Sequence, residues 1–145
     1  NGPKVLEFNA RFGDPETQVY MRLMKTDLLD ILEACADGKL KGKRIEWNSG
    51  FAVNIVLASG GYPDEYKKGF PITGIEDAEK VPGVVVFHAG TVYESELRTS
   101  GGRVLGVSAV GNTLKQSLKR AYEACEHIHF EGKYFRRDIG ARAFI

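Results

Sequence analysis

The sequence has no excess of charge of either sign, and it has few cysteines. Twenty basic side chains stand against nineteen acidic ones, which leaves a formal net charge of +1. A chain this close to neutral has no overall field that would draw it onto nucleic acid or an anionic membrane, and neither is expected as a partner. The two cysteines, Cys35 and Cys125, both lie among apolar residues in helix-like segments. This excludes a disulfide framework and favours reduced, packed thiols in a cytoplasmic protein.

Long hydrophobic runs and sorting signals are also absent from the sequence. No apolar stretch approaches the ~20 residues that a bilayer-spanning helix needs, and the start lacks the basic-then-apolar pattern of a signal peptide. The sequence has no internal repeat, no low-complexity stretch and no glycine-rich phosphate loop. Its 145 residues, 43% of them hydrophobic, suit one compact soluble domain, or a small domain that carries a piece of a neighbouring one.

The chain opens with the pattern of a strand that leads into a helix. Residues 4–11 alternate in side-chain character and are rich in strand formers, which predicts a strand. Asp14 is expected to cap the following helix, with Pro15 at its first position and Glu16 favourable to the helix dipole.

A second helix is expected to follow. Thr26 or Asp27 would cap its start, and Gly38 would end it. Its apolar side chains are expected to face the core, and these are Leu28, Leu29, Ile31, Leu32 and Cys35.

The remaining sequence has the pattern of strands separated by glycine- and proline-bearing turns. Three strands are predicted, over residues 51–59, 84–91 and 103–110, and residues 99–102 are interpreted as a hairpin turn. Asn112 is expected to cap a strongly amphipathic helix. The prediction is therefore an α+β fold in which an antiparallel sheet is packed against a helix.

A row of polar residues near the start can carry chemistry. On a strand, Glu7, Asn9 and Arg11 would share one face because successive side chains point to opposite faces. Carboxylate and amide oxygens suit Mg²⁺, and an arginine beside them can fork onto a carboxylate or a phosphoryl group. The spacing alone equally fits an amphipathic strand with a solvated polar face.

A resemblance to a known family favours the chemical interpretation. The Glu-x-Asn-x-Arg row resembles the metal-binding strand of ATP-grasp ligases, and residues 11–18, RFGDPETQ, resemble the signature of the phosphoribosylamine-glycine ligase family. The resemblance continues through the later part of the chain in the order that this family's C-terminal domain has. The similar segments are 58–63, 68–69, 72–74, 87–91 and 101–105.

The resemblance implies a fold and a reaction. Residues 1–48 would end an ATP-grasp domain, and residues 49–145 would form a small β-rich C-terminal domain. In this family ATP phosphorylates the carboxylate of glycine, and the amine of 5-phosphoribosylamine then attacks to give glycinamide ribonucleotide, ADP and phosphate. Family members are much longer, and their adenine pocket and phosphate-covering loop precede the matched region. We therefore expect a C-terminal piece that needs the missing N-terminal part of its parent for activity.

Roles for individual residues follow from the same resemblance. Glu7 and Asn9 are expected to bind Mg²⁺ or Mn²⁺, with ATP as co-substrate. Arg11 and Asp14 are expected to act in catalysis and to bind substrate.

Two cations of the later part are further candidates for substrate binding. Arg103 follows a double-glycine turn and Lys68 precedes a glycine, so either could hold the ribose phosphate of the substrate. Exposed cations at such places are more often only solvated.

Two other classes of function have weaker support in the sequence. A non-catalytic carrier or small-molecule binding module of barrel-sandwich type would need a lysine at an exposed hairpin tip, whereas Lys25 is predicted at a helix end. A nucleic-acid-binding protein would need a basic face with interleaved aromatics, and only the short run from Tyr134 to Arg137 offers one.

Overall fold

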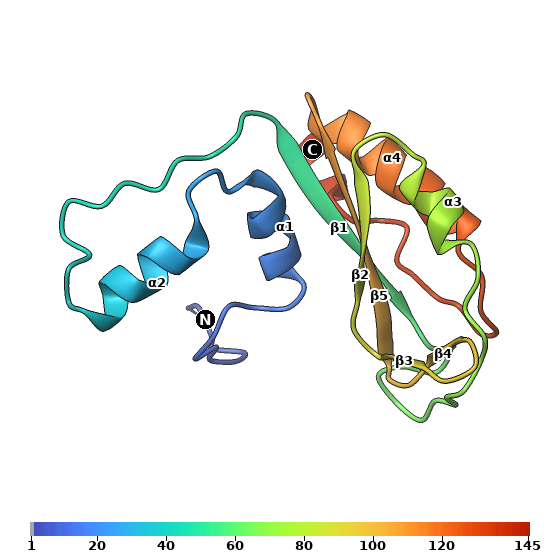
Figure 1. Cartoon of the computed structure of the whole chain (residues 1–145). Coiled ribbons are helices and arrows are strands. Elements are labelled where there is room, and N and C mark those ends of the chain that lie inside the picture. Colours follow the sequence, from blue (N-terminus) through green and yellow to red (C-terminus); the bar gives the residue numbers. More distant parts are fainter. Residues whose placement is uncertain (1) are drawn as a thin grey trace.

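The chain is an α+β protein, as the sequence predicts. The computed structural model describes residues 2–145 (Figure 1). The helices are α1 (Glu16–Leu23), α2 (Leu28–Ala36), α3 (Ile75–Glu79), α4 (Leu114–His127) and the 3-10 helix η1 (Ala141–Phe144). The strands are β1 (Phe51–Ala58), β2 (Val84–His88), β3 (Thr91–Tyr93), β4 (Leu97–Thr99) and β5 (Arg103–Gly111).

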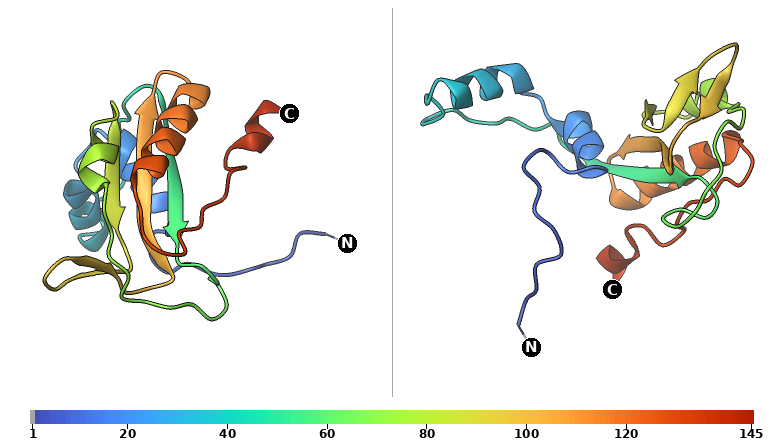
Figure 2. Two further views of the ribbon diagram at one scale, coloured as in Figure 1. Left: turned by 90° about the vertical axis from the view of Figure 1, so that its right-hand side faces the viewer. Right: turned by 90° about the horizontal axis from the view of Figure 1, so that it is seen from below.

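The main sheet has three antiparallel strands in the order β1-β5-β2. Alternate side chains of β1 enter one core, and Ile55 and Leu57 there are fully buried. The helices α3 and α4 cover this face of the sheet, and α1 lies against the opposite face (Figures 1 and 2). Burial of each such side chain stabilises the fold by about 1.5–3 kcal/mol, so this core holds the later part of the chain together.

The prediction of a hairpin over residues 99–102 is wrong. This segment joins β4 to β5, but β4 pairs with β3 in a separate two-stranded sheet, whereas β5 pairs with β1 and β2. The predicted strand 84–91 is likewise divided, because the chain turns after His88 and enters β3 at Thr91. Turn composition reports a change of direction and carries no information about which strands pair.

The cap of α4 lies one residue later than predicted. The Thr113 hydroxyl accepts a hydrogen bond from the Gln116 backbone N–H at 3.2 Å, so Thr113 and not Asn112 is the N-cap. The Asn112 backbone N–H instead donates to the Gln116 side-chain oxygen at 2.8 Å. Both residue types can cap a helix, and the backbone conformation decides between neighbours.

We expect Thr113→Ala to lower the free energy of unfolding by about 1 kcal/mol, because it leaves a helix N–H without its side-chain acceptor. Asn112→Ala is the matched control, since only its backbone takes part in the cap, and it should change stability by a few tenths of a kcal/mol at most. Urea unfolding of the two variants measures the difference. Equal losses would show that Thr113 has no special role.

The helix α1 begins differently from the prediction. Pro15 is the N-cap and Glu16 is the first helical residue, and no side chain caps the helix. The expected cap, Asp14, instead accepts a hydrogen bond from the Gln18 amide at 2.9 Å and pairs with Arg103. The prediction of an Asp14 cap is therefore wrong, because a contact distant in sequence takes up its carboxylate.

The helix α2 is capped as predicted but is not buried as predicted. The Asp27 carboxylate accepts from the Leu29 backbone N–H at 2.8 Å. Only Ile31 and Ala34 are buried in this helix, whereas Leu29, Leu32 and Cys35 are exposed. The helix stands apart from the sheet (Figure 2), so most of its apolar face is left uncovered by residues 2–145.

The two cysteines are free, as expected, but they differ in environment. Cys125 is fully buried in α4, and burial raises the pKa of its thiol to about 12. Cys35 is exposed, so only one of the two has the packed position that was predicted. Among residues 2–145, no helix combines the length and apolar character needed to cross a membrane.

The strand predicted over residues 4–11 is not formed. This segment is irregular and runs away from the sheet (Figure 2), and its apolar side chains Leu6 and Phe8 are 98% and 91% exposed. A strand needs a neighbouring strand to satisfy its backbone groups, and within residues 2–145 no strand pairs with this segment.

Candidate functional site

The polar row of the first segment remains together although the strand is absent. The Asn9 amide donates a hydrogen bond to a Glu7 carboxylate oxygen at 3.0 Å, and the Arg11 guanidinium donates to the Asn9 side-chain oxygen. Arg11 also donates to the carbonyl of Phe12 at 3.1 Å. All three side chains are exposed, so the row presents one carboxylate, one amide and one guanidinium to solvent.

This row is suited to a metal ion but supplies only part of a coordination shell. Glu7 and Asn9 carry hard oxygen atoms of the kind that Mg²⁺ prefers, but the Asn9 amide turns its nitrogen toward Glu7 and its oxygen toward Arg11, so a metal that used both oxygens would require the amide to turn. Within residues 2–145 there is no group of three or more histidine, cysteine, aspartate or glutamate side chains placed to hold a metal. A metal bound at this row therefore needs further ligands from phosphate, water or another part of the protein.

The structure brings two predicted substrate-binding residues into contact. A guanidinium nitrogen of Arg103, at the start of β5, donates to the Asp14 backbone carbonyl at 2.7 Å, and a second lies 3.2 Å from its carboxylate. The guanidinium therefore makes two contacts with Asp14, the residue before the N-cap of α1. This pair holds the region next to the polar row against the main sheet.

A second arginine ties α1 to the sheet. Arg22 donates to the carbonyl of Gly83, just before β2, at 2.8 Å, and burial lowers the pKa of its guanidinium. Arg22 thus adds a polar contact to an interface in which α1 has only partly buried side chains.

Lys68 lies in the loop between β1 and α3, away in sequence from the contact of Asp14 with Arg103. Its ammonium is 5.6 Å from the centroid of the Tyr66 ring, and Tyr66 packs edge-on against Tyr62 at 6.1 Å. These rings fill the space beside Gly102, where an added Cβ would lie 2.2 Å from Tyr62. Of the two predicted phosphate-binding cations, Arg103 lines the cavity beside β1 that is described below, whereas Lys68 does not line it.

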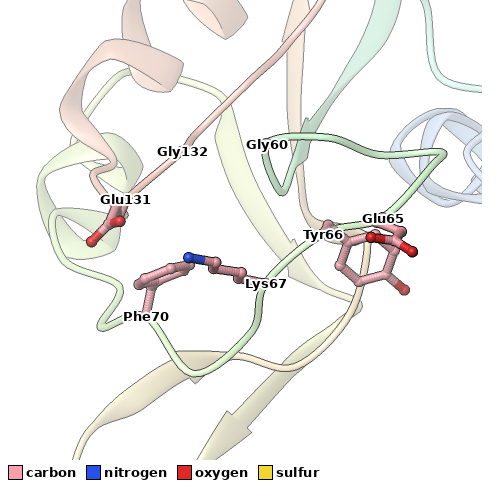
Figure 3. A pocket seen from close by; sticks show the side chains of 7 residues that line it. All are labelled: Gly60, Glu65, Tyr66, Lys67, Phe70, Glu131 and Gly132. Carbon is pink, nitrogen blue, oxygen red and sulfur yellow. The ribbon is translucent and has the colours of Figure 1, made fainter.

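One cavity of about 390 Å³ lies between the loop after β1 and the segment after α4 (Figure 3). Figure 3 shows Glu131 on one side of it and Glu65 with Tyr66 on the other. Its lining residues are Gly60, Glu65, Tyr66, Lys67, Phe70, Glu131 and Gly132. No part of this cavity was predicted, because its two walls are distant in sequence.

A second cavity, of about 310 Å³, lies beside β1 and Arg103. Asn54 borders it and is only 9% exposed, and neither its side-chain oxygen nor its nitrogen has a hydrogen-bond partner in the described part of the chain. Sequence reasoning missed Asn54, although an asparagine inside an apolar strand is the signal that could have found it. The lining residues are Pro15, Asn54, Ile55, Val56, Ala58, Tyr62, Arg103, Tyr134, Phe135, Arg136 and Ile139.

Comparisons with known proteins agree with this arrangement. The family model described as phosphoribosylglycinamide synthetase, C domain, matches residues 52–142. The phosphoribosylamine–glycine ligase of Caldanaerobacter subterraneus is 52% identical over 141 residues, which is 97% of this chain and 33% of that protein. The chloroplastic phosphoribosylamine–glycine ligase of Arabidopsis thaliana is 49% identical over 144 residues, which is 97% of this chain and 27% of that protein.

A solved structure shares the fold. The crystal structure of phosphoribosylamine–glycine ligase from Thermotoga maritima superimposes with a TM-score of 0.77 at 40% sequence identity, and it covers 94% of this chain and 33% of that one. The chain spans about a third of the length of the relatives that it matches.

Proposed function

The chain belongs to the phosphoribosylglycinamide synthetase family, and from this premise we propose that it is the C-terminal part of an ATP-dependent ligase of purine biosynthesis. The parent enzyme would join glycine to 5-phosphoribosylamine through glycyl phosphate and release glycinamide ribonucleotide, ADP and phosphate. The observation that carries the proposal is the polar row of Glu7, Asn9 and Arg11, which lies shortly before an Asp14 that the main sheet holds through Arg103.

The first two members of the row would bind Mg²⁺ or Mn²⁺. Glu7 supplies a carboxylate and Asn9 an amide oxygen, which is a suitable donor set for either hard cation. A metal held there, together with ATP, would neutralise charge on the phosphoryl oxygens during transfer. Its remaining ligands would come from ATP, water and the part of the parent that this chain does not span.

Arg11 would bind the substrate that carries the carboxyl group, and Asp14 would bind the substrate that carries the amine. Arg11 presents a guanidinium fork that suits the glycine carboxylate or its acyl phosphate. Asp14 presents a carboxylate that suits the amine of phosphoribosylamine, and Arg103 would position it. Arg103 would also contact a substrate phosphate bound next to Asp14, and Lys68, which lies over the Tyr66 ring, would contact phosphate only from the neighbouring loop.

The division of the chain into two parts is also a proposal. Residues 1–48 would complete an ATP-grasp domain, and residues 49–145 would be the small β-rich domain. Support comes from the core, which is built from the strands and helices after residue 49, while α1 and α2 contribute little to it. The exposed apolar face of α2 would pack against the preceding part of the parent.

The carrier-module alternative is not favoured. Lys25 follows α1, and its ammonium pairs with Glu46 at 2.8 Å, so it does not occupy an exposed hairpin tip. A cytoplasmic location is proposed for the parent from its free cysteines, although the name of the Arabidopsis relative places that protein in chloroplasts.

A direct assay of both forms tests the proposal. We expect the purified 145-residue chain to give no ADP from ATP, glycine and phosphoribosylamine, because it spans about a third of its relatives. The full-length parent should form ADP and glycinamide ribonucleotide, with each product requiring glycine. A parent that releases ADP equally without glycine would contradict the proposed reaction, and substantial ligation by the short chain would contradict the need for the remaining part.

A further inference from the structure

The strand β1 has one edge that is mostly without a hydrogen-bonded neighbour. In the main sheet, whose order is β1-β5-β2, it pairs only with β5. On its other side, the backbone of Ala58 exchanges two hydrogen bonds with Tyr134, at 2.8 and 2.9 Å. Within residues 2–145, no further backbone hydrogen bond reaches this side of β1. Most of the edge is therefore open to an additional strand.

The alternation of the strands shows which backbone groups lie on the open edge. Successive residues of a strand turn their N–H and C=O groups to opposite sides. Val110 of β5 turns toward β2, since its N–H donates to the Gly83 carbonyl at 3.1 Å, so Ala109 turns toward β1. Ala109 is the partner of Val53, whose backbone groups are therefore used on β5. The residues whose backbone groups point to the open edge are Ala52, Asn54 and Val56.

The cavity of about 310 Å³ lies along this open edge. Asn54 and Val56 line it from β1, and Tyr134 lines it from the segment after α4. The side-chain amide of Asn54 is buried, so this residue borders the cavity through its other atoms. The start of β1 is accessible, because Phe51 is 48% exposed. We call the open edge from Ala52 to Val56, together with this cavity, the β1 slot. Such a slot suits an extended segment with apolar side chains.

The first segment of the chain has the features that the β1 slot requires. Residues 4–11 have the alternating pattern of a strand, but in the described part of the chain no strand pairs with them. Their apolar side chains Leu6 and Phe8 are 98% and 91% exposed. A segment of this kind gains both backbone hydrogen bonds and burial of apolar surface when it joins the edge of a sheet.

The charges of the segment and of the slot also match. Arg136 lines the slot and contacts Asp138 through Nε and Nη2, at 2.9 and 2.7 Å, and no described hydrogen bond uses its Nη1. Glu7 is exposed, and the one described hydrogen bond that it accepts comes from Asn9, which is also exposed. The Glu7 carboxylate can therefore pair with Arg136 of a second copy.

The attachment of residues 4–11 favours a second copy over the same copy. Arg103 makes two contacts with Asp14, and the Gly13 carbonyl accepts from the Thr17 N–H at 2.9 Å. These contacts fix the direction in which residues 4–11 leave the domain, and Figure 2 shows them running away from the sheet. Pro15 lines the cavity, so the segment leaves the domain beside the slot. Two copies that face each other can then exchange their first segments in a closed, symmetric dimer.

From these observations we propose that two copies of the 145-residue chain associate by exchange of residues 4–11, which add as a strand to the open edge of β1 in the other copy. The proposal goes beyond the ligase activity and does not depend on it. The exchange would give residues 4–11 the neighbouring strand that their sequence pattern requires and would cover the open edge of the main sheet.

Sedimentation velocity and amide hydrogen exchange of the 145-residue chain, from micromolar to millimolar concentration, test the proposal. We expect a reversible change from one copy to two. Over the same range, exchange of the Asn54 and Val56 N–H groups should slow by roughly tenfold or more. The N–H groups of Val53 and Ile55 face β5 and should be protected at every concentration.

Two proline variants, Phe8→Pro and Asn9→Pro, separate strand pairing from simple contact of apolar side chains. Neighbouring N–H groups of a strand point to opposite sides, so one of the two prolines removes a hydrogen bond to β1 whatever the register. That variant should dimerise roughly tenfold more weakly or less, with an unchanged thermal midpoint, because residues 4–11 lie outside the core. Ile145→Pro, at the other exposed end, is the matched control and should dimerise normally.

A chain that remains a single copy at millimolar concentration overturns the proposal. Association that leaves the exchange of Asn54 and Val56 unchanged also overturns it, as does undiminished dimerisation of both proline variants. Protection of these two N–H groups in a single copy overturns it in favour of a segment that folds back onto its own sheet. None of these outcomes measures the glycine-dependent reaction of the parent, so the two proposals fail separately.

Discussion

Glu7→Gln in the full-length parent is expected to lower kcat by roughly 10²- to 10³-fold, the size of effect seen when a group that stabilises charge in the transition state is removed. The substitution keeps the size of the side chain but removes the negative charge that a metal ligand supplies. Thermal stability should hardly change, because Glu7 is exposed and the one described hydrogen bond that it accepts comes from Asn9, which is also exposed. Steady-state kinetics across a range of Mg²⁺ concentrations, with thermal unfolding in parallel, measures both effects.

Glu123→Gln is the matched control for this change. Glu123 lies on the exposed side of α4, far in sequence from the polar row, and its loss should leave kcat and the metal dependence unaltered. Partial recovery of the Glu7 variant at high Mg²⁺ or with Mn²⁺ would locate the defect in metal binding. A Glu7→Gln enzyme with full activity at low Mg²⁺ would show that the metal assignment is wrong.

Arg103→Met in the parent is expected to reduce kcat/KM by roughly 100-fold, because a small displacement of a positioning element can cost this much in rate. The guanidinium holds Asp14 through both its backbone carbonyl and its carboxylate, and methionine keeps the apolar stem but loses both contacts. Amide hydrogen exchange should become faster in α1 while the core strands β1 and β5 keep their protection. Kinetics and hydrogen exchange together distinguish a displacement of Asp14 and α1 from unfolding of the whole domain.

Arg142→Met removes the same chemical group at an exposed position near the C-terminus and should leave kinetics and exchange unchanged. Arg103→Lys keeps the charge without the planar fork, so it should restore only part of the activity. If Arg103→Met were as active as the parent, the contact with Asp14 would have no role in positioning the site. A global loss of exchange protection would instead assign Arg103 to the stability of the sheet.

Much of the fold could be read directly from the sequence. Strands β1 and β5 and helix α4 follow from local periodicity, because residues such as Ile55 and Leu57 alternate toward one core while Leu118, Ala121 and Cys125 recur at helical spacing. The signature from Arg11 to Gln18 identified the family for the same reason, since a contiguous motif needs no knowledge of folding.

Two predictions from the sequence failed because they depended on a partner that is distant in sequence. Residues 4–11 have the pattern of a strand, and Leu29 and Leu32 have the pattern of a core face. In the described part of the chain, however, no strand pairs with residues 4–11, and both leucines are exposed. Local propensity states what a segment can form, and only its surroundings determine whether it does.

The family, the α+β class, the main strands and the composition of the polar row follow from the sequence alone, because each is contained in short stretches of chain. Only the tertiary structure joined Asp14 to Arg103, removed Asp14 from the helix cap, and left the Asn54 amide buried beside a cavity. These features depend on tertiary structure because a hydrogen bond needs two residues that are close in space, and burial needs other residues to surround a side chain. Such pairs are brought together by sheet packing, which the order of residues along one segment does not specify.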